Sequence, residues 1–205
     1  MKQIDALQRL ESLGTPGFET RDAAALLGVS MPNASQILKR LEHAGFMLHA
    51  SRGRWLASRQ VNPQVLPELL AAPYPAYVSL QTALYYHGLI EQIPAVIYAV
   101  TLGRPRRMKT AAGTVSLHRV PPRLFTGFEV TGKDAIKMAT AEKALFDTFY
   151  LAPGRTRLFT MLPEIEIPKS FRWHELERYT TLVKSSGRRT FIADKIDQLK
   201  PRRKR

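Results

Sequence analysis

One set of polar side chains follows helical spacing directly after a Gly-Val-Ser break near residue 30. Asparagine and glutamine present a donor and an acceptor that match the edge of adenine, and serine, lysine and arginine hold phosphates. Such residue types on one outward helix face predict contacts with the major groove of double-stranded DNA. The predicted DNA-binding residues on this face are Ser30, Pro32, Asn33, Ser35, Gln36, Lys39 and Arg40.

A second pair of cations lies at the turn between two short segments with strand character, 46–50 and 54–57. Arg52 and Arg54 flank Gly53 at this turn. An arginine at a hairpin tip can enter a minor groove or contact the sugar-phosphate backbone. We therefore add Arg52 and Arg54 to the predicted DNA-binding residues, against the alternative that an exposed tip is basic without a role. Trp55 we expect in the core.

A third basic group occupies twenty residues of the second half that contain no acidic residue. Six uncompensated cations repel one another in a compact fold, and a polyanion would relieve that repulsion. Such a partner would be a DNA phosphate backbone, an RNA or an acidic protein. The alternative is that these residues form a solvated charged face without a partner. The six possible phosphate or partner contacts are Arg104, Arg106, Arg107, Lys109, Arg119 and Arg123.

The sequence offers no pattern of residues typical of catalysis. The five histidines lack the spacing of metal ligands. Glu142 and Asp147 are five residues apart on one predicted helix, so they point in different directions, and no glycine-rich elbow surrounds Ser79 to pair it with His87. We therefore predict no enzyme, no metal and no cofactor.

The elements that position the first set have the signature of a helix-turn-helix in the run AAALLGVSMPNASQILKRLEHAGF. Ala24 is small enough for two helices to cross, and Gly28 can take a positive φ in the tight turn. The reading helix is predicted at Met31–Ala44, ending before Gly45. With the hairpin after it, 20–57 is predicted as a winged helix-turn-helix, and a small domain for protein contacts is the alternative.

The rest of the chain mixes helical and strand patterns. A proline-rich stretch at 58–75 predicts a linker with one short helical turn. The fold class is predicted as α+β, an N-terminal winged helix-turn-helix followed by a C-terminal mixed α/β domain. The predicted domains are 1–60, a linker at 61–76, 77–198 and a basic tail at 199–205. We expect helices at 79–87 and 140–151, strands at 95–102, 115–120 and 124–130, and a basic loop at 103–110.

The composition supports a polyanionic partner. The chain of 205 residues has a net charge of +14, and residues 99–205 hold 23 basic and ten acidic side chains. Most of the charge therefore lies outside the segment expected to read DNA. Cysteine is absent, which excludes disulfides and thiolate metal sites and fits a reducing cytoplasm. No apolar run reaches the ~18 residues that would span a bilayer, so we expect no membrane partner.

Beyond the winged-helix pattern, the second half carries three runs in a fixed order: YVSLQTALYYHGLIEQIP, VTLGRPRR and ATAEKALFDTFYLAP. With them the chain, from about residue 5 to about residue 190, resembles the AbiEi family of antitoxins of bacterial type IV toxin–antitoxin, or abortive-infection, systems. The most specific parts are 79–88 and 139–151. Glu142, Lys143 and Asp147 match the family's pattern.

The resemblance implies a bacterial, cytoplasmic protein with two domains. The N-terminal domain would repress its own antitoxin–toxin operon by binding inverted repeats in the promoter. The C-terminal domain would counteract a nucleotidyltransferase-like toxin without a stable complex. Members of this family also present a positively charged surface, which would suit residues 103–123.

Two alternatives stay open. The chain is a stand-alone winged-helix regulator whose C-terminal domain senses a ligand or a partner, or the C-terminal domain is an enzyme that modifies the toxin, for example by transferring a phosphate.

Overall fold

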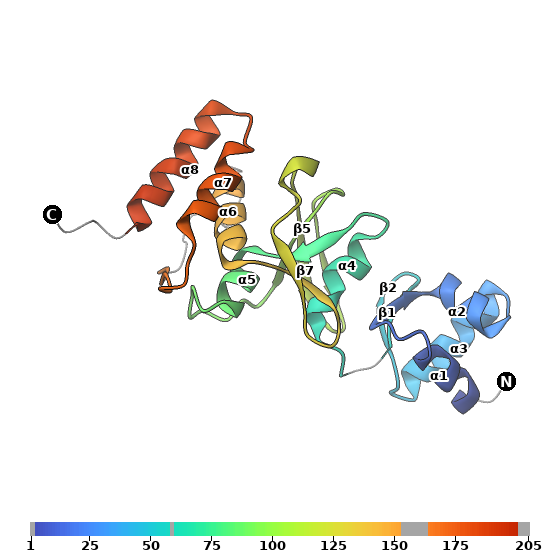
Figure 1. Cartoon of the computed structure of the whole chain (residues 1–205). Coiled ribbons are helices and arrows are strands. Elements are labelled where there is room, and N and C mark those ends of the chain that lie inside the picture. The colour runs from blue at the N-terminus through green and yellow to red at the C-terminus, as the bar shows by residue number, and fades with distance from the viewer. Residues whose placement is uncertain (1–2, 58–59, 153–163, 201–205) are drawn as a thin grey trace.

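A computed structural model describes residues 3–57, 60–152 and 164–200 (Figure 1). The first of these ranges contains three helices and three short strands, in the order α1, β1, α2, α3, β2, β3. The strands form an antiparallel sheet in the order β1-β3-β2. The elements are α1 Gln3–Glu11, β1 Gly17–Glu19, α2 Thr20–Leu27, α3 Met31–His43, β2 Leu48–Ser51 and β3 Arg54–Leu56.

The helices of this N-terminal part pack around a small apolar core. Ile37, Leu38 and Leu41 of α3 are buried, and α2 ends at Gly28 with the expected positive φ of 66°. Trp55 is buried as predicted, and its indole Nε1 donates to Thr20 Oγ1 at 2.9 Å. This bond ties the β2–β3 hairpin to the start of α2. The buried residues of this core are Ala6, Leu10, Phe18, Ala23, Leu27, Ile37, Leu38, Leu41, Met47 and Trp55.

The remaining residues build a six-stranded sheet with helices on both faces. Its strand order is β6-β7-β5-β4-β9-β8, with parallel pairs β4–β9 and β5–β7 and antiparallel pairs elsewhere. The strands are β4 Ala76–Val78, β5 Ile97–Thr101, β6 Arg106–Thr110, β7 Gly113–Arg119, β8 Phe128–Thr131 and β9 Ile136–Ala139. The helices are η1 Pro63–Val65, α4 Leu66–Ala71, α5 Leu80–Tyr86, η2 Pro122–Leu124, α6 Ala141–Leu151, α7 Trp173–Thr181 and α8 Ser186–Leu199.

The two faces of this sheet carry different helices. Side chains alternate along a strand, so Tyr77, which bonds to Asp147 of α6, faces away from its neighbours Ala76 and Val78. Helix α4 covers the face of Ala76, and α5 to α8 gather on the side of Tyr77. Figure 1 shows α4 on the side of the sheet that is nearer the N-terminal elements. Within the described ranges, no helix combines the length and the apolar character needed to cross a bilayer.

The segment at 61–76 was predicted as a linker, and this prediction is wrong for most of its length. Its helix α4 is packed into the apolar core around the six-stranded sheet, which is the larger of the two cores, and Leu66 and Leu70 are fully buried there. On its other side, α4 meets the N-terminal sheet, because a Cβ added at Gly17 would lie 2.9 Å from Leu69 Cδ2. The prolines misled the prediction, since Pro67 lies in the first turn of α4, where a missing N–H costs nothing.

The mixed α and β class is confirmed, and most predicted elements are present. The basic loop predicted at 103–110 is wrong in its second half, which forms the edge strand β6. The strand predicted at 124–130 is instead η2 followed by β8, and β1, β4 and β9 were not expected. Helix α2 is capped by Glu19, whose N–H donates to Asp22 Oδ2 at 2.9 Å. The last five residues of the expected basic tail lie outside the described residues.

Because α4 fills the space between two sheets, shortening one of its buried side chains should destabilise the whole protein. We expect Leu70→Ala to lower the free energy of unfolding by about 2–5 kcal/mol, the range for a leucine removed from a packed core. Leu182→Ala, at a position that is 38% exposed, is the control and should cost well under ~1 kcal/mol. Urea unfolding of both variants measures the difference. Equal costs would show that α4 is no part of the core.

Candidate nucleic-acid interface

Helix α3 exposes the polar face that the sequence predicts. Asn33, Gln36 and Arg40 lie three and four residues apart and are exposed, so they form one stripe along the helix. Ser30, Pro32 and Lys39 are also exposed, and Ser35 is half-buried. The opposite face of α3 is anchored by Ala34, Ile37, Leu38 and Leu41, which are buried.

The functional groups on this stripe are available for an external partner. Neither Asn33, Gln36 nor Lys39 makes a side-chain hydrogen bond or an ion pair with another residue of the described ranges. Arg40 makes one long bond within its own helix, from Nε to the Gln36 carbonyl at 3.4 Å. Their amide and cationic donors therefore face solvent with their hydrogen-bonding capacity unused.

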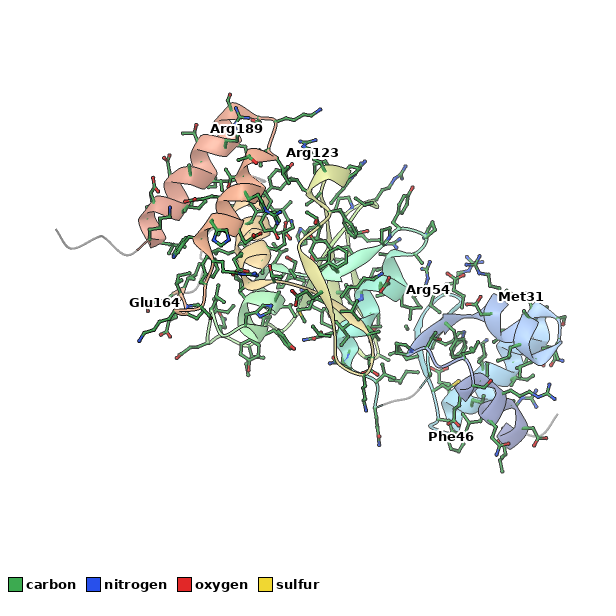
Figure 2. All side chains as sticks on the ribbon, in the orientation of Figure 1. Met31, Phe46, Arg54, Arg123, Glu164 and Arg189 are labelled. Carbon is green, nitrogen blue, oxygen red and sulfur yellow. The ribbon has the colours of Figure 1, made fainter. Side chains whose placement is uncertain are left out.

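The two arginines of the hairpin have different environments. Arg52 is exposed at the tip, and with Arg21 and Met31 it borders a shallow depression between the hairpin and the start of α3. Arg54 also lines this depression, as does Glu19, but its guanidinium is engaged within the protein. Its Nη2 donates to the Ala72 carbonyl at 3.0 Å, and its Nε lies 3.5 Å from Glu19 Oε1. Arg54, labelled in Figure 2, is thus occupied inside the protein, whereas Arg52 is free to meet a ligand. Sequence analysis did not include Arg21.

The third basic group is divided between two faces of the second sheet. Arg106 and Arg119 lie on the α4 side, because Arg106 pairs with buried Leu117 and Arg119 follows two residues later. An Arg106 guanidinium nitrogen donates to the Leu70 carbonyl at the end of α4. Arg104 lies in the turn before β6 and lines the same cavity as these two arginines. These three residues therefore do not share a surface with the rest of the group.

Arg107 and Lys109 project from the opposite face of β6 and are exposed. Their neighbours on this face are Tyr98 and His118, whose rings lie 6.2 Å apart. Burial raises the pKa of Tyr98, and the nearby Arg107 charge opposes that shift. Burial also lowers the pKa of His118, so this imidazole is neutral near pH 7. The positive charge of the face thus comes from Arg107 and Lys109.

Strand β6 lies beside β2 of the N-terminal sheet, but Arg107 and Lys109 project from the face of β6 that points away from α4. Arg123 is not part of this surface. Its Nε donates to the Leu182 carbonyl at 2.8 Å, so it joins η2 to the end of α7 (Figure 2). Of the six residues predicted as one group, two project from the face of β6 opposite α4, three line a cavity and one fastens a helix.

The most strongly buried polar group in the described ranges is centred on Asp147 of α6. Its carboxylate accepts from Tyr77 at 2.9 Å and from Ser79 at 2.8 Å, and it forms an ion pair with Lys143 one turn earlier. Both charged side chains are fully buried. Burial lowers the pKa of Lys143 and raises that of Asp147, and their mutual attraction opposes both shifts.

This buried group joins β4, the start of α5 and α6, and it has no access to a substrate. Sequence analysis considered Ser79 with His87 and did not pair Lys143 with Asp147. The signal was a Lys-to-Asp spacing of four on a helix whose other residues are mostly apolar. His87 is turned elsewhere, with its Nε2 2.7 Å from the Ala139 carbonyl.

Near the surface of the same helix, Glu142 is held by Arg172. The Glu142 Oε1 accepts from the Arg172 backbone N–H at 3.0 Å and from its Nε at 3.2 Å. Burial raises the pKa of Glu142, but these bonds outweigh it and the pKa is lowered. No cluster of three or more acidic or histidine residues suited to a metal ion occurs in the described part of the chain.

A scan against protein-family models matched no family, and a search of curated proteins returned no match.

The buried pair yields a test of its structural role. Lys143→Met leaves the Asp147 charge buried without its partner, and we expect it to lower the free energy of unfolding by about 3–5 kcal/mol. The double variant Lys143→Met/Asp147→Leu should lose less than the sum of the two single losses, because it removes both charges together. Urea unfolding of Lys143→Met, Asp147→Leu and the double variant, compared with the parent protein, completes the double-mutant cycle. Lys133→Met, at an exposed position, is the control, and strictly additive losses would contradict the pairing.

Proposed function

We propose that this protein is a sequence-specific DNA-binding transcriptional regulator whose N-terminal part is a winged helix-turn-helix. The observation that carries the proposal is the exposed face of α3, where the side-chain amides of Asn33 and Gln36 are unused and Arg40 makes only one long bond within the helix. An α-helix fits the major groove, and these side chains can pair with base edges there.

The order of elements supports this proposal. A helix, a strand, two helices and a two-stranded hairpin follow one another, and the three strands form one antiparallel sheet. In such an arrangement the second helix of the helix-turn-helix unit reads the groove and the hairpin acts as the wing. Arg52 at the hairpin tip borders the same depression as Met31, the first residue of α3. The wing and the reading helix would therefore approach DNA from one side.

The second sheet would add a nonspecific contribution to binding. Arg107 and Lys109 are exposed on the face of β6 opposite α4, and the β6 strand itself lies beside β2 of the N-terminal sheet. Cations beside a DNA-reading unit can bind neighbouring phosphates and release counterions. The proposed division of labour gives α3 the sequence preference and gives β6 part of the affinity.

We further propose, from the resemblance to AbiEi antitoxins, that the regulated promoter is that of its own operon with a nucleotidyltransferase-like toxin. The second part of the chain would then counteract the toxin. A footprint on the DNA upstream of the gene tests the regulatory half of this proposal. Protection of inverted repeats is the expected result, and a footprint without sequence preference would contradict it.

The reading helix can be tested by removing its polar groups together. Asn33→Ala/Gln36→Ala/Arg40→Ala should abolish the preference for operator over scrambled DNA, because each base-specific pair contributes about 1–3 kcal/mol of discrimination. A gel-shift titration with both DNAs measures the preference.

The control for this experiment is Gln3→Ala/Gln8→Ala/Arg9→Ala on α1. It removes two amides and one cation from three exposed positions of another helix. The control should keep the preference of the parent protein. If the α3 variant also keeps it, α3 is not the reading helix.

The contribution of β6 should be visible in the salt dependence of binding. Arg107→Gln/Lys109→Gln is expected to reduce the slope of log K against log salt by about 2, since each phosphate contact contributes ~0.9. The preference for operator DNA should not change, because these residues would contact phosphates alone. Fluorescence anisotropy from 50 to 200 mM salt measures the slope, and an unchanged slope would remove β6 from the interface.

A further inference from the structure

A cavity of about 320 Å³ lies where the end of α4 meets the second sheet. One wall is residues 71–74, and another is the turn 101–104 after β5. Arg106 of β6 and Leu117 and Arg119 of β7 complete the lining. This volume is within the range of ~300–1,000 Å³ typical of small-molecule sites.

The lining of this cavity is cationic and contains no acidic residue. Three arginines contribute to it, and the sequence has no aspartate or glutamate between Glu91 and Glu129. Arg104 and Arg119 make no side-chain hydrogen bond or ion pair within the described part of the chain. Guanidinium groups without a protein partner beside a cavity favour a bound anion, and their planar fork matches a phosphate.

Arg106 differs from the other two because it is already held in place. One of its guanidinium nitrogens donates to the Leu70 carbonyl. A guanidinium carries five N–H donors, so this bond orients the group and leaves other donors available. A cation fixed in this way loses little conformational freedom when a ligand binds.

The cavity is also bordered by an aromatic ring, that of Tyr74. A Cβ added at Gly103 would lie 2.9–3.3 Å from the side chain of Tyr74, so this tyrosine packs directly on the glycine backbone. Tyr74 nevertheless remains 52% exposed. An exposed ring that is fixed beside cations can stack on a flat ring of a ligand.

We propose that this cavity binds a small phosphate monoester that carries a flat ring, of the chemical class of a nucleoside monophosphate. The three arginines hold the phosphate, and Tyr74 stacks on the ring. The DNA backbone offers the same phosphate chemistry, but a concave cavity with an aromatic wall fits a small ligand better than the outside of a duplex. This site is separate from α3 and does not depend on the proposed regulatory function.

Isothermal titration calorimetry of the full chain tests the site with four probes: adenosine 5′-monophosphate, ribose 5-phosphate, inorganic phosphate and adenosine. Adenosine 5′-monophosphate should bind most tightly, the other two phosphates more weakly, and adenosine not detectably. Arg104→Gln/Arg119→Gln should weaken binding of adenosine 5′-monophosphate on the order of 100-fold, since two charge-assisted contacts are lost. Lys133→Gln/Lys184→Gln removes the same charge at exposed positions and should bind as the parent does.

A second variant separates the ring from the phosphate. Tyr74→Ala should weaken binding of adenosine 5′-monophosphate to the level of ribose 5-phosphate and leave ribose 5-phosphate unchanged. The proposal is overturned if no phosphate binds at millimolar concentration, or if the arginine variant binds as tightly as the lysine control. It is equally overturned if the arginine variant loses affinity for DNA while none of the four probes binds, because the arginines then serve the DNA backbone.

Discussion

Two arginines from different sheets donate to the last carbonyls of one short helix. Arg54 of β3 reaches Ala72, and Arg106 of β6 reaches Leu70. The end of a helix leaves carbonyls without partners and carries a partial negative charge, so a buried helix end needs cations or donors. Helix α4 receives one from each side, and its leucines fill the space between the two sheets. The position of the hairpin, the proximity of β6 to β2 and the walls of the arginine-lined cavity all depend on this arrangement.

The charged side chains fall into two groups, a buried ion pair and a larger set of exposed cations. Lys143 and Asp147 are fully buried and satisfied by each other, and the hydroxyls of Tyr77 and Ser79 complete the carboxylate. Removing one such partner is far more costly than removing a surface charge. Most of the net charge of +14, by contrast, belongs to side chains that face solvent. The buried pair specifies how α6 meets the sheet, and the exposed cations remain available for an anionic partner.

The sequence predicted the N-terminal part well because local signals agree there. Gly28 takes the positive φ that the turn needs, and Ile37 and Leu38 follow the helical period on the buried face of α3. The residues of α3 that are left on the other side form its polar face. The predictions for 61–76 and for β6 failed because tertiary contacts decide them. Pro67 suggests a helix break, but in the structure it lies in the first turn of α4, where proline is tolerated. The cations of the edge strand β6 obscure the alternation of apolar and polar residues that would have indicated a strand. The separation of Arg106 from Arg107 and Lys109 onto opposite faces required the register of β6 with β7, which no local pattern reveals.

The packing of α4 also determines which segment of this chain could be transferred intact to another protein. Ala50 and Leu56 belong to the N-terminal sheet, yet they are buried in the larger core together with α4. A fragment that ended near residue 60 would leave the apolar underside of that sheet facing water. The unit that can be exchanged intact between proteins therefore extends through α4, and the N-terminal part grafted without it would tend to aggregate.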